Sequence, residues 1–276
     1  MTEEVYTASV PVVVDTEWLS AHISENDLVS VDVRAPYFFA QAHLPGAVNL
    51  PPFLLQGPSG GPPPAEEMAH RLGDLGVTRE THVVAYDEGG SPAAAMLYWV
   101  LRYFRHPRVS VLDGGITRWR HQGRDWEYSS LVPAPAPYQI GDPDPDVYAQ
   151  LDDIRAAVDT PDRVILDVRA PAEYLGLQQA ARRSGHIPGA VNMEWSNALE
   201  RDDTGLPVLR PLAEMRSVLS QAGVSPEKEV IVHCNSGARS SHTFLVLEAL
   251  GYPRVRQYVA GWQEWGNRAD TPVEEE

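Results

Sequence analysis

The chain has 276 residues, 43% of them hydrophobic, and a formal net charge of −16. Length and composition fit one or two globular domains, and the negative charge argues against nucleic acid or an anionic membrane as a partner. No apolar run approaches the ~20 residues that a membrane helix needs, and residues 1–7 lack the pattern of a signal peptide. We therefore expect a cytoplasmic protein with no membrane partner.

Short apolar runs alternate with helical patterns in the first half of the chain. Strands are predicted at residues 29–33, 82–86 and 109–112. Strands that alternate with helices indicate a parallel sheet with helices on both faces. The predicted fold class is therefore α/β.

A proline-rich stretch follows at residues 129–147, with prolines at 133, 135, 137, 143 and 145. Prolines at this spacing prevent a helix and favour an extended chain. The acidic residues between them lack the glycine and closing glutamate of a calcium loop. We interpret this stretch as an acidic linker.

The second half has the same alternation of elements. Strands are predicted at 164–168, 229–233 and 254–259, and helices at 212–222 and 243–250. Gly251 and Pro253 mark the end of the last helix.

Three sequence blocks occur in both halves, in the same order and at nearly constant spacing. Val-Asp-Val-Arg-Ala-Pro at 31–36 returns as Leu-Asp-Val-Arg-Ala-Pro at 166–171, and His-Leu-Pro-Gly-Ala-Val-Asn at 43–49 as His-Ile-Pro-Gly-Ala-Val-Asn at 186–192. Gly115 and Trp119 match Gly261 and Trp265. Such self-similarity indicates a duplicated domain. We predict domains at 10–128 and 148–271, joined by the linker.

Cys234 is the only cysteine, which excludes an intramolecular disulfide and a cysteine-rich zinc site. No metal site and no cofactor are indicated. Cys234 directly follows the strand at 229–233, and a helical pattern begins soon after. Backbone N–H groups in such a loop can converge on one centre, and the helix dipole and Arg239 add positive potential. These features favour a reactive thiolate over an inert cysteine.

The loop Cys234-Asn235-Ser236-Gly237-Ala238-Arg239 resembles the six-residue active-site loop of the rhodanese family. The Asp-Val-Arg, His-Ile-Pro-Gly-Ala and Gly-Trp blocks resemble other signatures of that family. The resemblance extends from about Val12 to Thr271 and implies two rhodanese-like domains. In the first domain Asp87 aligns with Cys234, and no arginine follows it, which implies that this domain is inactive.

The resemblance implies a thiosulfate sulfurtransferase. Cys234 would take the sulfane sulfur of thiosulfate as a persulfide and pass it to a thiophilic acceptor such as cyanide. Partners would thus be a small anionic sulfur donor and that acceptor. We expect Cys234 and Arg239 to be catalytic. The residues expected to bind substrate are Asn235, Ser236, Gly237, Ala238, Arg182, Arg183, Trp195 and Trp262.

Other functions remain open at this point. The loop lacks the Gly-Val-Thr ending usual in mercaptopyruvate sulfurtransferases, yet Glu173 stands where some thiosulfate-using members have a cation, so mercaptopyruvate remains a possible donor. A non-enzymatic persulfide carrier or binding module is a further alternative. Phosphatases of the His-Cys type place five residues before the arginine, whereas four separate Cys234 from Arg239. The shorter loop disfavours phosphate.

Several residues are interpreted as structural. The pairs Asp32–Arg34 and Asp167–Arg169 occur in both halves and are expected to be ion pairs. The remaining residues of this kind are His43 and His186, expected to stabilise turns, and Trp119 and Trp265, expected in the core. A role for His233 and His242 in tuning Cys234 is a weaker hypothesis.

Overall fold

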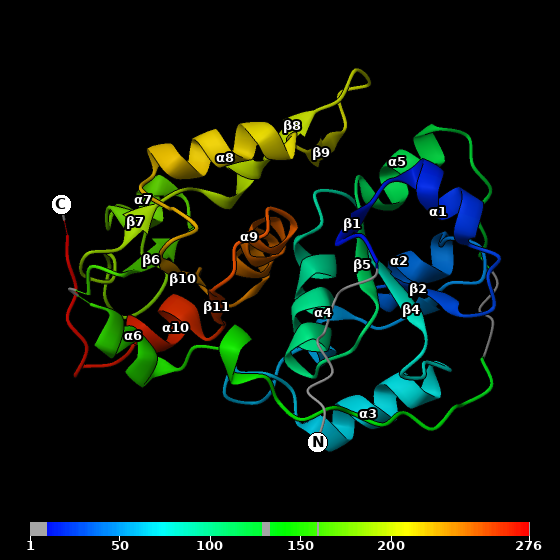
Figure 1. The fold of residues 1–276 in the computed structure, drawn as a ribbon, viewed down its shortest axis with the longest axis horizontal. Helices are drawn as coiled ribbons and strands as arrows, with labels where there is room; N and C mark the ends of the chain where they lie inside the picture. Colours follow the sequence, from blue (N-terminus) through cyan, green and yellow to red (C-terminus); the bar gives the residue numbers. More distant parts are fainter. Residues whose placement is uncertain (1–9, 129–132, 159, 276) are drawn as a thin grey trace. The chain divides into compact units, whose positions relative to one another are not determined.

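The computed structural model describes residues 10–128, 133–158 and 160–275, so the first four residues of the predicted linker lie outside the described residues. The chain divides into two compact units (Figure 1). Unit 1 contains the described residues up to Leu54 together with Pro63–Pro143, and unit 2 contains Leu55–Pro62 and the described residues from Asp144 onward. Each unit is described by itself.

Unit 1 is built on a five-stranded sheet in the order β1-β5-β4-β2-β3, with every neighbouring pair parallel. Its strands are β1 (Val13–Val14), β2 (Leu28–Asp32), β3 (Val48–Asn49), β4 (His82–Tyr86) and β5 (Val109–Leu112). Its helices are α1 (Thr16–His22), α2 (Pro36–Gln41), η1 (Pro52–Leu54), α3 (Ala65–Asp74), α4 (Pro92–Tyr103) and α5 (Gly115–His121).

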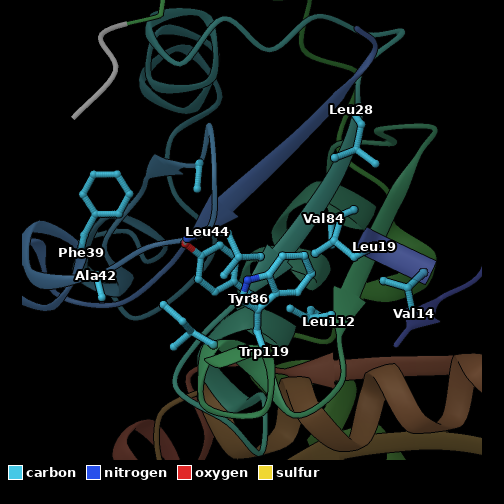
Figure 2. Packing of buried hydrophobic residues seen from close by; sticks show 12 residues of the cluster. Val14, Leu19, Leu28, Phe39, Ala42, Leu44, Val84, Tyr86, Leu112 and Trp119 are labelled. Carbon is cyan, nitrogen blue, oxygen red and sulfur yellow. The ribbon is translucent and has the colours of Figure 1, made fainter. Parts of the chain in front are cut away.

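Apolar residues of β4 alternate between the two faces of this sheet, as the pleat requires. Val84 and Tyr86 join one core cluster with Leu19 of α1 and with Trp119 of α5 (Figure 2). Val83 and Ala85, also fully buried, point to the opposite face, where α4 packs against β4 and β5. Burial on both faces explains why this strand is a continuous apolar run.

Unit 2 repeats this plan with a four-stranded parallel sheet in the order β11-β10-β6-β7, and adds an antiparallel hairpin of β8 and β9. Its strands are β6 (Arg163–Asp167), β7 (Val191–Asn192), β8 (Leu199–Arg201), β9 (Pro207–Leu209), β10 (Glu229–His233) and β11 (Val255–Tyr258). Its helices are η2 (Pro145–Val147), α6 (Leu151–Ala157), α7 (Pro171–Tyr174), η3 (Trp195–Ala198), α8 (Leu212–Gln221), α9 (Ala238–Ala249) and α10 (Gly261–Trp265).

The core of unit 2 lies between the sheet and the helices α6 and α10. Ile165 of β6 and Ile231 of β10 pack there with Trp265 of α10, and all three are buried. Residues two positions further along each strand lie on the same face. Asp167 and His233, the last residues of the two central strands, therefore lie on this face at the carboxyl end of the sheet.

The predicted α/β fold is confirmed, and the predicted strands match β2, β4, β5, β6, β10 and β11 to within one residue at each end. Helix α9 begins at Ala238, five residues before the predicted start. Its first turn carries polar residues, which hid the helical pattern, although Ser240, Ser241 and His242 are buried. The β8–β9 hairpin was not predicted.

The predicted structural ion pairs are confirmed in both units. Arg34 Nη2 lies 2.7 Å from Asp32 Oδ2, and Arg169 Nη2 lies 2.6 Å from Asp167 Oδ2. Trp119 and Trp265 are buried, as expected for core residues. None of the helices in the described part of the chain combines the length and apolar character that a bilayer crossing requires.

Candidate active site

Cys234 lies at the carboxyl end of β10, which pairs with β6 on one side and β11 on the other. Ligand sites of parallel α/β sheets lie at this end of the strands. A short loop leads from Cys234 to Gly237, the residue that directly precedes α9. The sheet thus places the single thiol of the chain directly before the N-terminus of a twelve-residue helix.

One N–H of the loop donates to the sulfur, and a hydroxyl of α9 lies beside it. Gly237 N–H donates to Cys234 Sγ at 3.2 Å, and Ser240 Oγ lies 3.5 Å from the same sulfur. Cys234 is buried, with 1% of its surface exposed. The sulfur therefore lies inside the loop, beside the N-terminus of α9, where the helix dipole is positive.

Glycine is required at position 237. Its φ is +102°, and an added Cβ would lie 2.7 Å from Val259 Cγ2. This backbone conformation is strained for other residues. It turns the Gly237 carbonyl into the protein and its N–H toward the sulfur.

Gln257 of β11 holds that carbonyl in place. Its side-chain amide donates to Gly237 O at 2.9 Å, and Ser240 Oγ and Ser241 Oγ donate to the same oxygen at 2.9 and 3.0 Å. Sequence analysis missed Gln257, which is fully buried in β11 and therefore needs hydrogen-bond partners for its amide.

The other loop carbonyls are bound by the start of α10. Trp262 N–H donates to Cys234 O at 2.9 Å, and Gln263 N–H donates to Asn235 O at 3.0 Å. Gly261 permits this approach, because a Cβ there would lie 2.3 Å from Cys234 O. The first residues of α10 thus fix the backbone of the Cys234 loop through its carbonyl oxygens.

Arg239 makes an ion pair with Glu173 of α7. Its Nη1 and Nη2 donate to Glu173 Oε2 and Oε1 at 2.5 and 3.0 Å. Burial alone would raise the pKa of Glu173, but the bound guanidinium lowers it below its usual value. Hydrogen bonding to Glu173 raises the pKa of Arg239, so both groups are charged at neutral pH. Sequence analysis noted Glu173 but did not predict this pair.

The two histidines beside the loop are buried. Burial lowers the pKa of His233, with Asp167 opposing the shift, and lowers the pKa of His242 to about 4. Both imidazoles are therefore neutral at pH 7. His233 Nδ1 lies 3.2 Å from Cys234 O, and the ring of His242 packs edge-on against Trp195 at 5.2 Å.

The remaining predicted binding residues lie in different surroundings. Trp195 is half-buried in η3, and Arg182 is exposed. The Arg183 guanidinium donates to the backbone carbonyls of Trp265 and Thr271 at 2.8 and 2.6 Å. Trp262 is fully buried, with Arg169 stacked 4.4 Å from its ring centroid. The structure thus brings together the six loop residues but places Arg183 and Trp262 in structural contacts.

A cavity of about 370 Å³ adjoins the loop on the side of Ser236. It is lined by Gln56, Ser59, Gly60, Ser236, Val259, Ala260, Gln263 and Glu264. Gln56 Nε2 donates to Ser236 O at 2.7 Å, which ties the segment 55–62 to the loop within unit 2. Ser236 itself is exposed, so the loop has one solvent-facing residue at this cavity.

Unit 1 contains a matching loop in which a carboxyl group takes the place of the thiol. Asp87 follows β4 as Cys234 follows β10, and Ile116 N–H donates to Asp87 O at 3.0 Å, as Trp262 does to Cys234 O. The predicted alignment of Asp87 with Cys234 is confirmed. The Asp87 carboxylate accepts four backbone N–H bonds, from Gly89, Ser91, Ala93 and Ala94 at 3.0, 3.2, 3.1 and 3.3 Å. This loop architecture can therefore surround an anion with amide hydrogens.

Replacing Asp87 with asparagine should destabilise unit 1 by about 3 kcal/mol, because an amide NH₂ cannot accept from the N–H groups that face it. Chemical denaturation of both proteins measures the difference. Glu66→Gln is the control, since it removes one charge from an exposed position in α3. Equal free energies of unfolding for Asp87→Asn and the unmodified protein would contradict the structural role.

Comparison with known proteins agrees with this geometry. Residues 15–122 and 150–268 each match the rhodanese-like domain. The chain belongs to the rhodanese family. The two matches correspond to the two halves of the duplicated chain, and the predicted resemblance is confirmed.

Two similar rhodaneses are the thiosulfate sulfurtransferases of Azotobacter vinelandii and Pseudomonas aeruginosa. The first is 36% identical over 97% of this chain and 98% of its own length, and the second is 34% identical over the same shares. A sulfur carrier protein of Thermus thermophilus is 30% identical over 95% of this chain and 96% of its own. The fold also matches an anaerobic ergothioneine biosynthesis enzyme from Chlorobium limicola (TM-score 0.85, 24% identity), covering 96% of this chain and 70% of that one.

Proposed function

We propose that this rhodanese transfers the sulfane sulfur of thiosulfate to a thiophilic acceptor such as cyanide, through a persulfide on Cys234. The observation that carries the proposal is the position of the only cysteine. It directly follows the central strand β10, the Gly237 N–H of its loop donates to its sulfur, and the Ser240 hydroxyl of α9 lies 3.5 Å from that sulfur. The thiosulfate sulfurtransferases similar to this chain over nearly their full length support the choice of donor.

The reaction would proceed in two steps. In the first, the Cys234 thiolate attacks the sulfane sulfur, the S–S bond of thiosulfate breaks, and sulfite leaves with the bonding electrons. In the second, cyanide attacks the outer sulfur of the persulfide, thiocyanate leaves, and the thiolate returns. Such a sequence gives ping-pong kinetics.

The loop would stabilise the charge that moves through both steps. Gly237 N–H and the Ser240 hydroxyl already contact Sγ, and the N–H groups at the start of α9 add the positive end of its dipole. We propose that Asn235, Ser236, Gly237 and Ala238 enclose the transferred sulfur. The positive charge of Arg239 acts on Cys234 as well as on Glu173.

Outside the loop, we propose that Trp195 and the exposed Arg182 contribute to binding of the anionic donor. We also propose a cytoplasmic setting, where reducing conditions keep a single thiol free for catalysis.

The proposal is tested by the mass of the protein. Incubation with thiosulfate should increase the mass by that of one sulfur atom, and later addition of cyanide should remove the increase and release an equal amount of thiocyanate. Protein incubated without thiosulfate is the control. Thiocyanate formation without a sulfur-loaded protein, or no product at all, would contradict the persulfide mechanism.

A further inference from the structure

The cation of the active-site loop is already bound to a carboxylate. Two guanidinium nitrogens of Arg239 contact the two oxygens of Glu173 at 2.5 and 3.0 Å. The side chains of Arg239 and Glu173 are 27% and 9% exposed, so solvent screens the pair only partly. Glu173 Oε2 also accepts the N–H of Ala170 at 3.1 Å, which fixes the carboxylate at the start of α7.

This pair lies within electrostatic reach of the reacting sulfur. The charge of a Cys234 thiolate is among the interactions that raise the pKa of Arg239, after the hydrogen bond from Glu173. Arg239 directly precedes Ser240, whose Oγ lies 3.5 Å from Cys234 Sγ, so its charge is close to the reacting sulfur as well as to Glu173. A donor that binds next to Cys234 adds further negative charge, and Glu173 repels it while competing for the same guanidinium.

The size of that repulsion depends on the charge of the donor. Thiosulfate carries two negative charges, whereas an organic thiosulfonate presents the same kind of sulfane sulfur with one. Coulomb energy is proportional to the product of the charges, so Glu173 penalises thiosulfate about twice as strongly.

We propose that Glu173 is a specificity-determining residue, which weakens binding of doubly charged sulfur donors relative to singly charged ones by neutralising Arg239. This proposal rests on the proposed sulfur transfer through Cys234. It assigns to Glu173 a bias against the second negative charge of a donor, while thiosulfate remains the proposed donor.

The test is Glu173→Gln, assayed with thiosulfate and with methanethiosulfonate. Glutamine has the same size, and its amide oxygen can still accept the Ala170 N–H. The KM for thiosulfate should fall about tenfold and that for methanethiosulfonate about threefold, with kcat nearly unchanged, as expected for removal of one charge a few ångströms away. Equal changes for the two donors, or none, would overturn the assignment.

Two further variants show whether the effect acts through Arg239. In an Arg239→Gln background, Glu173→Gln should change the ratio of the two KM values less than it does with Arg239 present, because only the direct repulsion between Glu173 and the donor remains. Glu214→Gln, which removes a charge from the exposed pair with Arg210 on α8, should leave the ratio as it is in the unmodified protein. A change of the same size in the Arg239→Gln background would mean that Glu173 does not act through Arg239. A change of the same size in Glu214→Gln would mean that net charge, not Glu173, sets the preference.

Binding without turnover separates this proposal from the proposed function. Calorimetry measures the affinity of thiosulfate for Cys234→Ser protein with and without Glu173→Gln, and we expect tighter binding by about tenfold when Glu173 is absent. No turnover by the unmodified protein with either donor would contradict the proposed function alone. Unchanged thiosulfate affinity in the calorimeter would contradict the role of Glu173 alone.

Discussion

Cys234→Ser is expected to abolish thiocyanate formation, with a loss on the order of a thousandfold or more. Serine cannot accept the sulfane sulfur, because an oxygen–sulfur linkage does not replace the disulfide-like bond of a persulfide. No second cysteine exists in the chain to take over. The rate of thiocyanate formation from thiosulfate and cyanide measures the loss.

The same substitution should leave the fold intact. Gly237 N–H can donate to the serine oxygen that replaces Sγ, and the Ser240 hydroxyl keeps its bond to Gly237 O, so no buried donor is left without an acceptor. Thermal unfolding should therefore change little. Residual activity near that of the unmodified protein, in a variant that unfolds normally, would show that Cys234 does not carry the sulfur.

Gly261→Ala is expected to lower activity by on the order of a hundredfold, because small displacements of reacting groups have effects of this size. The new methyl group would lie 2.3 Å from Cys234 O and 2.9 Å from Asn235 O, so the loop has to move. Alanine is also strained at the φ of +55° found here. Activity and thermal unfolding, measured on one preparation, separate the two effects.

Unit 1 offers a matched control. Gly115 has the same φ of +55°, and its added Cβ would lie 2.4 Å from Asp87 O, so Gly115→Ala should destabilise the protein to a similar degree. It should retain most of the activity, since its clash lies in the loop without a cysteine. Gly223→Ala, at φ +77° with open space around it, tests the backbone strain alone. Equal losses of activity in Gly115→Ala and Gly261→Ala would contradict a local effect on the Cys234 loop.

The sequence was sufficient to predict the duplicated α/β fold, because the evidence was local. The parallel strands β4, β6 and β10 have apolar cores of three or more residues, such as residues 230–232 of β10, and the Asp-Val-Arg and His-x-Pro-Gly-Ala blocks fixed the equivalence of the two halves. The short strands β1, β3 and β7 have two residues each, too few to show a period. The β8–β9 hairpin lacks a typical two-residue turn, so it gave no comparable signal.

The loop from Cys234 to Arg239 was predictable as a strand, a turn and a helix start, since these features are contiguous. Its supports were not, because they come from distant positions. Glu173 binds Arg239 across 66 residues and Gln257 binds Gly237 across 20, and nothing in the local pattern pairs them. A buried glutamine and an acidic residue after Ala-Pro-Ala are visible in the sequence, but their partners follow only from the fold.

The Asp87 loop gives the chain an internal reference for the chemistry of its counterpart. Four amide hydrogens in unit 1 donate to the carboxylate of Asp87, a side chain of the protein itself. These hydrogen bonds form when the protein folds and do not change afterwards. In the proposed cycle, the corresponding loop of unit 2 would instead gain and lose the outer sulfur of the Cys234 persulfide at every turnover. The same loop architecture would thus stabilise a fixed carboxylate in unit 1 and a sulfur group that changes during each catalytic cycle in unit 2. Formation of the persulfide would therefore raise the free energy of unfolding of unit 2 and leave that of unit 1 unchanged.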